Sequence, residues 1–396
     1  MKEKLSFGSK IIILDRVIGN AIDLFLNTFL AAYFYKITED NMIYIAIYYI
    51  IVWIFATIGA IILGDYIKRK NKVILYRCGT FIKAGYILLI IILKERILDY
   101  IWLIAIIYGI TVSTTGFPFN MLESEAVDEK ERTKYMGYKS AIGEITKVIA
   151  PIFLGVYITF SSYQIAAILV FVLSIIKVII TFFIKNVNNR NEKITLKRFV
   201  KEVKARPNYP IKKLWVIEFF KGITFNGVLD IIISLLIIYE VKTELNLGIW
   251  SSLFSICMII TMMIFAKKYN KKRPKPILLV CSFSIIVSFV LIMFKVNMTT
   301  IIIYNLAYYI FMKMLYTITD INLFDYSNKP PFEKELNTEY FIFREICLNI
   351  GRVLGYVILL FVGLSHNLEY LKLLFLCTTI AMLAIARISR NINVSE

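Results

Sequence analysis

The chain has 396 residues, of which 59% are hydrophobic and only 19% are charged, and its mean hydropathy is +0.71. A composition this apolar excludes an ordinary soluble protein of this length and indicates a chain that crosses a membrane many times. The five cysteines stand singly and the only histidine is His366, so the spacing offers neither a disulfide framework nor a metal site.

Twelve apolar segments follow one another, each long enough to span a membrane as a helix. They cover 11–35, 42–64, 73–93, 98–121, 136–160, 163–186, 213–239, 246–266, 276–294, 299–324, 339–363 and 367–387. The one long polar connection separates the sixth and seventh segments. Its basic residues and two prolines indicate a cytoplasmic linker, partly an amphipathic helix on the membrane surface. We therefore predict an all-α membrane protein with an N-terminal bundle at 1–186, a linker at 187–212 and a C-terminal bundle at 213–396.

The first segment carries a polar or small residue at every fourth position, which places these residues on one face of a helix. They are Asp15, Gly19, Asp23 and Asn27. The same line returns 203 residues later as Glu218, Gly222, Asn226 and Asp230. Carboxylates inside a membrane helix are costly, so they are expected to face a protein interior or a wet cavity. The repeat indicates two related halves that face each other across a polar path.

A second set of landmarks, on other helices, repeats at an offset of 202 residues. It pairs Asn120 with Asn322, Glu123 with Asp325, and Tyr138 with Tyr340. Two similar offsets from separate helices predict two pseudo-symmetric six-helix bundles with twelve transmembrane helices in total.

The lysines and arginines predict the orientation. If the N-terminus is cytoplasmic, 31 of the 46 fall in inner segments and 6 in outer ones. This bias predicts that both termini are cytoplasmic, in the plasma membrane of a bacterium. It also explains the net charge of +18 as topology and attraction to anionic membrane lipids, so nucleic acid is not expected as a partner.

The loop between the second and third segments reads Gly64-Asp-Tyr-Ile-Lys-Arg-Lys-Asn-Lys72. It resembles the inner loop of the major facilitator superfamily of secondary transporters, with Asp65, Arg69 and Lys70 at matching positions. Two glycines of the family pattern are replaced, by Ile61 and Lys68. The resemblance implies a gating role for these three residues. The alternative is that Asp65 ends a helix beside solvated positive-inside residues.

Two further stretches resemble the same family. The region around Arg132 is similar to the basic loop between the fourth and fifth spans, which adds Arg132 to the gating residues. Ala150-Pro151 with Gly155 is similar to the signature of the exporter branch. The resemblance implies alternating access, a cavity lined by spans one, four, seven and ten, and export by an antiporter (efflux) mechanism.

The charges predicted to lie inside the membrane supply the candidate site. Glu144 and Lys147 are three residues apart on one helix and can pair, and so can Glu218 and Lys221, for which a packing role is favoured. Arg344 and Glu345 are read as a packing pair too, and Arg16 as a residue that reaches back to the inner interface. The predicted substrate and proton pathway consists of Asp23, Asn27, Glu144, Lys147, Asn226, Asp230, Lys313 and Arg352. Asp23, Lys313 and Arg352 are favoured as functional because no opposite charge lies one helical turn away from them.

The function that these features predict is secondary transport of a small polar or amphiphilic solute, coupled to protons, with Asp23 as the first proton carrier. Both signs of charge favour an anionic, zwitterionic or peptide-like solute. Two alternatives stay open, a lipid or lysolipid flippase of the same fold and a non-transporting membrane sensor or scaffold. No nucleophile–base set, nucleotide loop or metal signature supports an enzyme, so no cofactor is expected. The expected partners are the solute, protons and membrane lipids, and the expected state is a monomer.

Overall fold

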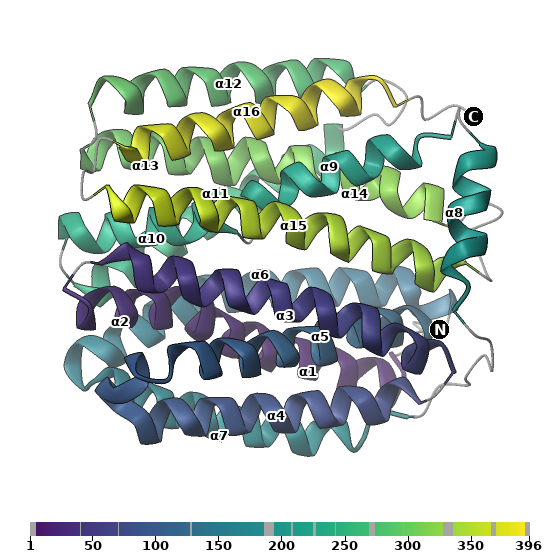
Figure 1. The fold of residues 1–396 in the computed structure, drawn as a ribbon, viewed down its shortest axis with the longest axis horizontal. Coiled ribbons are helices and arrows are strands. Elements are labelled where there is room, and N and C mark those ends of the chain that lie inside the picture. The colour runs from purple at the N-terminus through teal and green to yellow at the C-terminus, as the bar shows by residue number, and fades with distance from the viewer. Residues whose placement is uncertain are drawn as a thin grey trace. The chain divides into compact units, whose positions relative to one another are not determined.

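The structure is a computed structural model that describes residues 5–39, 41–69, 71–126, 129–185, 194–206, 209–224, 227–241, 243–268, 274–295, 297–327, 336–365 and 370–392. All regular structure in these ranges is helical (Figure 1).

The first half of the chain forms nine helical segments in the described ranges. They are α1 (Phe7–Leu24), the π-helical turn η1 (Phe25–Phe29), α2 (Leu30–Ile37), α3 (Met42–Arg69), α4 (Lys72–Leu93), the 3-10 turn η2 (Lys94–Leu98), α5 (Ile101–Ala126), α6 (Glu129–Phe160) and α7 (Tyr163–Thr181).

A short helix, α8 (Leu196–Ala205), precedes the helices of the second half. These are α9 (Ile211–Thr224), α10 (Val228–Val241), α11 (Glu244–Lys268), α12 (Lys275–Phe294), α13 (Met298–Ala307), the π-helical turn η3 (Tyr308–Met312), α14 (Lys313–Ser327), α15 (Asn337–Leu364) and α16 (Leu371–Arg390).

The all-α prediction is confirmed. In the described part of the chain, 11 helices or helical runs are long and apolar enough to cross a membrane. The predicted span at 73–93 corresponds to α4, a helix of 22 residues that carries Arg77 and Lys83 and is not among these 11. The total of twelve spans therefore stays a prediction.

The helices group into two compact units. Unit 1 comprises Met1–Asp40, Ile51–Lys193 and Thr243–Ser252, and unit 2 comprises Asn41–Ile50, Ile194–Lys242 and Leu253–Glu396. Unit 1 thus includes Thr243–Ser252 from the second half of the sequence, and unit 2 includes Asn41–Ile50 from the first half. Each of these ten-residue segments contains the beginning of a helix. The predicted boundaries at 1–186, 187–212 and 213–396 stay a prediction.

Specific contacts explain these two helix starts. At the start of α11, Glu244 pairs with Lys36 at 3.1 Å, and the Ser252 hydroxyl donates to the Val148 carbonyl at 2.6 Å, all within unit 1. At the start of α3, the Tyr49 ring stacks on Tyr356 with 4.8 Å between ring centroids, within unit 2.

One helix crossing organises unit 2. Helices α9 and α15 lie side by side and α16 packs against α9 (Figure 1). A Cβ at Gly222 would lie 2.0 Å from the Leu348 carbonyl oxygen, and one at Gly351 would lie 2.0 Å from that of Phe219. The two backbones are therefore in contact, as small residues permit between membrane helices. This contact explains why a glycine stands among the polar positions of α9.

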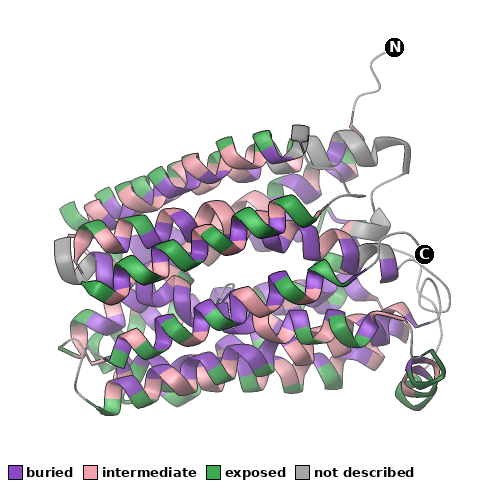
Figure 2. Ribbon diagram, turned by 90° about the horizontal axis from the view of Figure 1, so that it is seen from above, coloured by how far each residue is buried: buried purple, intermediate pink, exposed green. Residues whose placement is uncertain are grey.

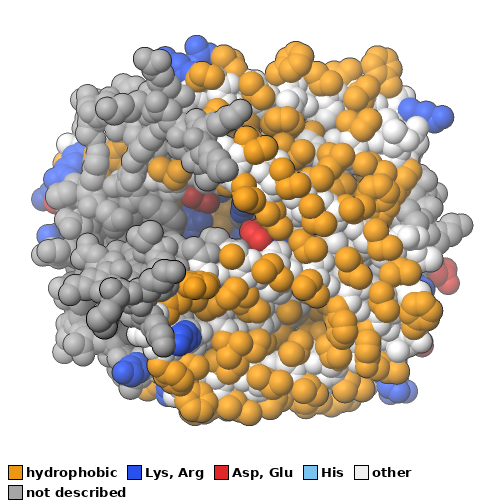
Figure 3. Space-filling view, turned by 180° about the vertical axis from the view of Figure 1, so that it is seen from behind, with side chains coloured by type: hydrophobic (Ala, Val, Ile, Leu, Met, Phe, Trp, Pro, Cys, Tyr) orange, Lys and Arg blue, Asp and Glu red, His pale blue; other side chains and the backbone are white. Residues whose placement is uncertain are grey.

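Hydrophobic side chains cover the outward surfaces of the helices. Exposed residues follow one face of many helices in Figure 2, and the described part of the face in Figure 3 carries mainly hydrophobic side chains. Phe160, Phe283 and Phe294 are among the most exposed, at 78%, 70% and 84%. A surface of this kind suits lipid rather than water, so the chain is a multi-pass membrane protein.

The linker helix α8 packs against three other helices of unit 2. Phe199 and Val203 on its apolar face are buried in a cluster with Ile211, Leu323 and Tyr340, which belong to α9, α14 and α15. The expectation of an amphipathic helix is correct, but its apolar face is covered by protein rather than by the membrane surface. At the N-terminal end of α8, the buried carboxylate of Glu339 accepts a hydrogen bond from the backbone N–H of Thr195 at 2.9 Å.

Replacing Phe199 with alanine should loosen this docking. The ring is fully buried, so truncation should cost about 3–5 kcal/mol of docking free energy. We expect faster proteolysis within 194–206 of the purified protein. Leu196→Ala is the matched control, since Leu196 is on the same helix but 37% exposed. Equal cleavage of the two variants would contradict the docking role of Phe199.

Candidate functional site

The most buried ion pair of unit 1 joins α1 to α7. Asp15 is fully buried, and its Oδ2 lies 2.7 Å from the Lys177 ammonium, which also donates to the Asp15 carbonyl oxygen at 2.7 Å. The Tyr76 hydroxyl of α4 donates a short hydrogen bond to the same Oδ2. One carboxylate thus connects three helices, which is how a buried charge is made tolerable in a membrane.

Gly19, one helical turn after Asp15, leaves room for this lysine. A Cβ at Gly19 would lie 3.0 Å from Lys177 Nζ, which is tighter than ordinary contact. The ammonium also lies 5.5 Å from the Tyr76 ring centroid and 5.7 Å from that of Phe119, within the range of cation–π attraction. The missing side chain at Gly19 therefore allows Lys177 to reach Asp15.

Asp23 forms a second, less buried pair. Its carboxylate is in contact with the ammonium of Lys83 on α4, whose side chain is only 9% exposed against 46% for that of Asp23. The sequence shows no opposite charge one helical turn away from Asp23 on its own helix, and the partner in the structure comes from another helix. A half-exposed carboxylate inside a membrane helix is expected to border a wet space rather than lipid.

Arg16 belongs to a network around Glu123, one of the residues that repeat at the offset of 202. It pairs with Glu123 at 3.2 Å, and Lys139 lies 2.5 Å from the same carboxylate. The Tyr135 hydroxyl donates to Glu123 at 2.6 Å, and burial together with this bond raises the pKa of Tyr135. Arg16 is thus held by Glu123, and its predicted reach to the inner interface stays a prediction.

Asn27 lies in the π-helical turn η1 and is exposed. Its Oδ1 accepts a hydrogen bond from the Tyr108 hydroxyl at 3.1 Å. Burial therefore falls along the predicted stripe, from Asp15 through Asp23 to Asn27. A second π-helical turn, η3, directly precedes Lys313. Such turns are frequent at functional sites.

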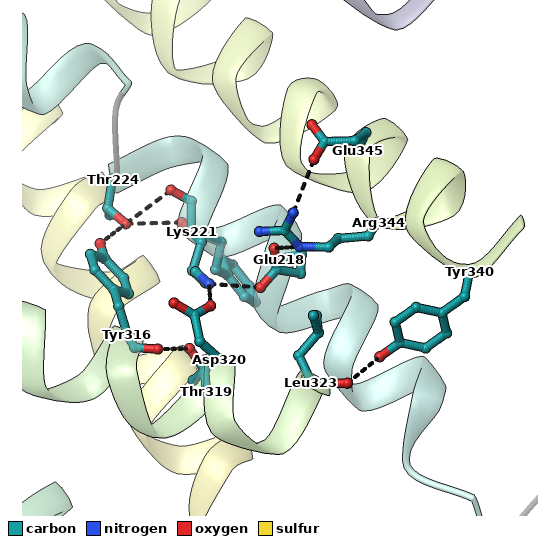
Figure 4. A network of polar contacts seen from close by, with 11 residues as sticks. Glu218, Lys221, Thr224, Tyr316, Thr319, Asp320, Leu323, Tyr340, Arg344 and Glu345 are labelled. Atoms are coloured by element: carbon teal, nitrogen blue, oxygen red, sulfur yellow. Dashed lines mark hydrogen bonds and ion pairs between the residues drawn. The ribbon is translucent and has the colours of Figure 1, made fainter. Parts of the chain in front are cut away.

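Unit 2 contains a larger network, drawn in Figure 4. Lys221 lies between two carboxylates, 2.8 Å from Glu218 of its own helix and 2.6 Å from Asp320 of α14. Arg344 of α15 pairs with Glu218 at 2.9 Å and with Glu345 at 2.9 Å. The expected pairs Glu218–Lys221 and Arg344–Glu345 are both present. The Arg344–Glu218 pair joins them into one network, and the Lys221–Asp320 pair adds Asp320 to it.

Aromatic and hydroxyl side chains surround this network. The Tyr316 ring centroid lies 5.7 Å from Lys221 Nζ, and its hydroxyl forms a short hydrogen bond with Thr224. The Tyr308 hydroxyl donates to the Thr224 carbonyl oxygen at 2.9 Å, which satisfies one carbonyl at the C-terminal end of α9.

The remaining predicted pathway residues are spread over both units. Lys147 pairs with Glu144 at 2.7 Å, as expected from their spacing. Arg352 is buried and donates to Asn349 Oδ1 at 2.9 Å. Asp230 lies in the first turn of α10, where the helix dipole favours a carboxylate. Lys313 begins α14 and is partly buried, and Asn226 lies outside the described residues.

The predicted gating residues are only partly described. Asp65 and Arg69 form an i,i+4 ion pair at 2.8 Å near the end of α3. Lys70 lies outside the described residues. Arg132 lies in α6, and its side chain lies outside the described part of the structure.

A family comparison decides the class of protein. Residues 121–356 match the family described as Major Facilitator Superfamily, which is more than half of the chain. The chain belongs to this superfamily. It is therefore a transporter-family protein and not an enzyme, and the predicted resemblance of the chain to this superfamily is confirmed.

Similar proteins agree with this membership of the superfamily. The chain is 22% identical over 333 residues to the uncharacterized protein YqgE of Bacillus subtilis (strain 168), covering 83% of this chain and 76% of that protein. It is similar in fold to a bacterial homologue of the iron transporter ferroportin in an inward-facing state, with a TM-score of 0.68 and 14% identity over 98% of this chain and 99% of that one. A mutant of the nucleoside transporter NupG gives a TM-score of 0.67 and 14% identity over 96% and 98% of the two chains.

Sequence reasoning about this superfamily member missed Lys177 and Tyr76 as partners of Asp15. Both lie in apolar segments, and Lys177 is 162 positions from Asp15, so no local spacing links them. It also left Asp320 out of the candidate site, although the tenth segment carries a polar stripe of its own, formed by Asn305, Tyr309, Lys313, Tyr316 or Thr317, and Asp320. The stripe is the signal that could have found it.

Lys177→Met should destabilise the protein strongly. It removes the ammonium and leaves a buried carboxylate at Asp15 without its cation, a change that costs about 3–5 kcal/mol. We expect a lower melting temperature in detergent. The double variant Asp15→Asn with Lys177→Met removes both charges and should recover most of the loss. A single variant as stable as the wild type would show that this pair does not support the fold.

Proposed function

We propose that this protein is a secondary active transporter that moves a small polar or amphiphilic solute across the plasma membrane by alternating access. It exchanges the solute for protons and exports it. The solute is anionic, zwitterionic or peptide-like. The proposal combines membership of the superfamily with the ionisable groups inside the helices.

The observation that carries the proposal is the Asp23–Lys83 pair. Asp23 lies on the first helix of the chain, half exposed, while the lysine that holds it is buried. Solvent or solute can therefore reach the Asp23 carboxylate, whereas the Lys83 ammonium stays buried. Protonation of Asp23, or capture of a solute group by Lys83, would break this pair, so the two events are linked.

The polar groups along the proposed pathway set the class of solute. Asn27 and Asp230 offer acceptors, and Lys147, Lys313 and Arg352 offer donors. A pathway that contains both positive and negative side chains suits a solute that itself carries charged or polar groups. The similar folds include an iron transporter homologue and a nucleoside transporter, but at 14% identity they support only the fold. A metal substrate is not part of the proposal, and among the described residues no group of three or more His, Cys, Asp or Glu side chains is arranged so that it could hold a metal ion.

The test is proton movement that depends on solute. Purified protein in vesicles with an internal pH dye would receive three probe classes, namely amino acids, dipeptides and dicarboxylates, with a lipophilic cation as control. We expect one of the three polar classes to drive proton flux, and the cation to drive none.

The two alternatives give different results in the same vesicles. A flippase would move a fluorescent lysolipid between leaflets without any proton flux. A sensor or scaffold would move neither probe. Either result would replace the proposal.

Gating is assigned to the inner loop that resembles the superfamily pattern. Asp65 and Arg69 pair at 2.8 Å with both side chains more than one-third exposed, so the pair can form and break at little cost. Lys70 and Arg132 complete the proposed gating set.

The orientation is tested by labelling. In a cysteine-free background, Lys201→Cys on the exposed face of α8 should react with an impermeant reagent only from the cytoplasmic side. Lys295→Cys, after α12, is the matched control and should react only from outside. The opposite pattern would invert the proposed topology and place both termini outside.

Asp23→Asn should abolish solute-driven proton flux, because an amide cannot carry the proton. The exchange also leaves the buried Lys83 unpaired and should lower thermal stability. The double variant Asp23→Asn with Lys83→Met removes that charge, so it should regain stability and still lack flux. Normal flux in the stable double variant would remove Asp23 from the mechanism and leave Glu144 and Asp230 as the proton carriers.

A further inference from the structure

Helix α8 carries its lysines on the side opposite to its docked face. Lys197, Lys201 and Lys204 are exposed and stand four and three residues apart, so they form one stripe along the helix. The two buried residues of α8, Phe199 and Val203, lie on the opposite side. Because unit 2 covers the apolar side, the lysine stripe is the side that α8 presents to its surroundings.

The helix lies at the level where two neighbouring helices begin. The Phe199 ring centroid lies 5.9 Å from that of Trp215 and 5.0 Å from that of Phe343. Trp215 belongs to the second turn of α9 and Phe343 to the second turn of α15. In Figure 1, α8 runs across these two helices rather than along them. Since α9 and α15 belong to runs that can cross a membrane, α8 lies along the membrane surface, where tryptophan also gathers.

Basic residues at two other helix ends extend the lysine stripe. Lys212 and Lys213 in the first turn of α9 are exposed, and so are Arg387 and Arg390 in the last turn of α16. Helix α16 packs against α9, and the Lys213 ammonium donates to the Asn391 carbonyl oxygen at 3.3 Å. The ends of α9 and α16 thus lie together and are both basic.

Acidic residues are scarce in these segments. Helix α8 has four basic residues and one acidic residue, Glu202, whose carboxylate lies 3.8 Å from the Arg206 guanidinium. The first turn of α9 and the last turn of α16 contain no acidic residue. The segments therefore present an excess of positive charge, which a partner with dense negative charge would neutralise.

We propose that the lysine stripe of α8, together with the basic ends of α9 and α16, binds the phosphate headgroups of anionic phospholipids in the leaflet beside α8. Charge complementarity and the position along the membrane surface favour a lipid surface over a soluble polyanion. Each basic residue near an anionic membrane strengthens binding about fivefold. This binding needs no solute and no transport, so it stands apart from the proposed function.

A docked helix differs from the general excess of lysine and arginine in inner segments. That excess orients the chain without any fixed geometry. The α8 lysines are instead held in one row, because Phe199 and Val203 fix the helix on unit 2. A row that is already ordered can contact several headgroups without paying again to order the chain.

Lysine labelling tests the proposal on the unaltered protein. Nanodiscs of phosphatidylcholine, with and without phosphatidylglycerol, would be treated with an amine-reactive reagent and read lysine by lysine by mass spectrometry. We expect phosphatidylglycerol to slow the labelling of Lys197, Lys201 and Lys204 about tenfold. Lys10 and Lys275 are exposed lysines of other segments predicted on the same side, and they should slow no more than about twofold. Equal slowing at all five lysines would overturn the proposal.

A triple variant tests the same stripe by lipid retention. Lys197→Gln, Lys201→Gln and Lys204→Gln remove three positive charges from exposed positions, so the melting temperature in a neutral detergent should stay that of the wild type. Native mass spectrometry of protein mixed with equal amounts of phosphatidylglycerol and phosphatidylcholine should show at least about tenfold less retained phosphatidylglycerol. A lowered melting temperature in neutral detergent would assign the lysines to the fold and count against the proposal.

The charge-matched control is Lys10→Gln with Lys185→Gln and Lys275→Gln, three exposed lysines outside the stripe. It should retain phosphatidylglycerol as the wild type does. Undiminished retention in the α8 variant, or an equal loss in both variants, would overturn the proposal. Protection of the α8 lysines by soluble tripolyphosphate in lipid-free detergent, as strong as that by phosphatidylglycerol, would also overturn it, because the stripe would then take a soluble polyanion.

Discussion

The fold depends on giving polar partners to the ionised groups that the helices carry into their apolar interior. An isolated charge at that depth costs about 3 kcal/mol or more, so a buried carboxylate is stabilised by a cation or a hydrogen-bond donor from the same or a neighbouring helix. Asp15 with Lys177 ties α1 to α7, and Glu218 with Arg344 ties α9 to α15. These pairs specify which helices are neighbours in a core where apolar contacts alone are as favourable with lipid as with protein.

The two halves meet this requirement in different ways although their sequences repeat. Asp15 and Glu218 stand 203 residues apart on the first helix of each half and are both fully buried. Asp15 receives one lysine and a tyrosine hydroxyl, whereas Glu218 receives a lysine and an arginine. The glycines one helical turn after these carboxylates also have different roles. Gly19 makes room for the Lys177 side chain, whereas Gly222 lets the backbones of α9 and α15 touch. The repeat therefore keeps the spacing of polar and glycine residues, while the side chains that contact them differ between the two halves.

The helical fold could be predicted from the sequence because membrane helices are recognised by their length and apolar composition. Pairs such as Glu144–Lys147 and Glu218–Lys221 could be predicted because they follow from helical periodicity. Contacts between helices could not be predicted in the same way. Helical spacing gives Asp23 no partner on its own helix, and Lys83 reaches it from α4. The docking side of α8 was equally hidden, since an amphipathic pattern gives the apolar face but not what covers it. Side-chain pairs between distant segments depend on packing that a single sequence does not encode locally.

One arrangement recurs in both units. Asp23 and Asp320 are each about half exposed, and each is held by a lysine that is almost fully buried. A carboxylate at the boundary between a wet space and the helix core can exchange protons or solute groups, while the lysine behind it cannot leave. The consequence of exchange then depends on the lysine's other partners. Lys221 has Glu218 as a second carboxylate, whereas Asp23 is the carboxylate in contact with Lys83 among the described ion pairs. Neutralising Asp23 would therefore remove that ion pair from Lys83, while neutralising Asp320 would leave Lys221 paired with Glu218. The two lysines thus depend to different degrees on the half-exposed carboxylate in front of them.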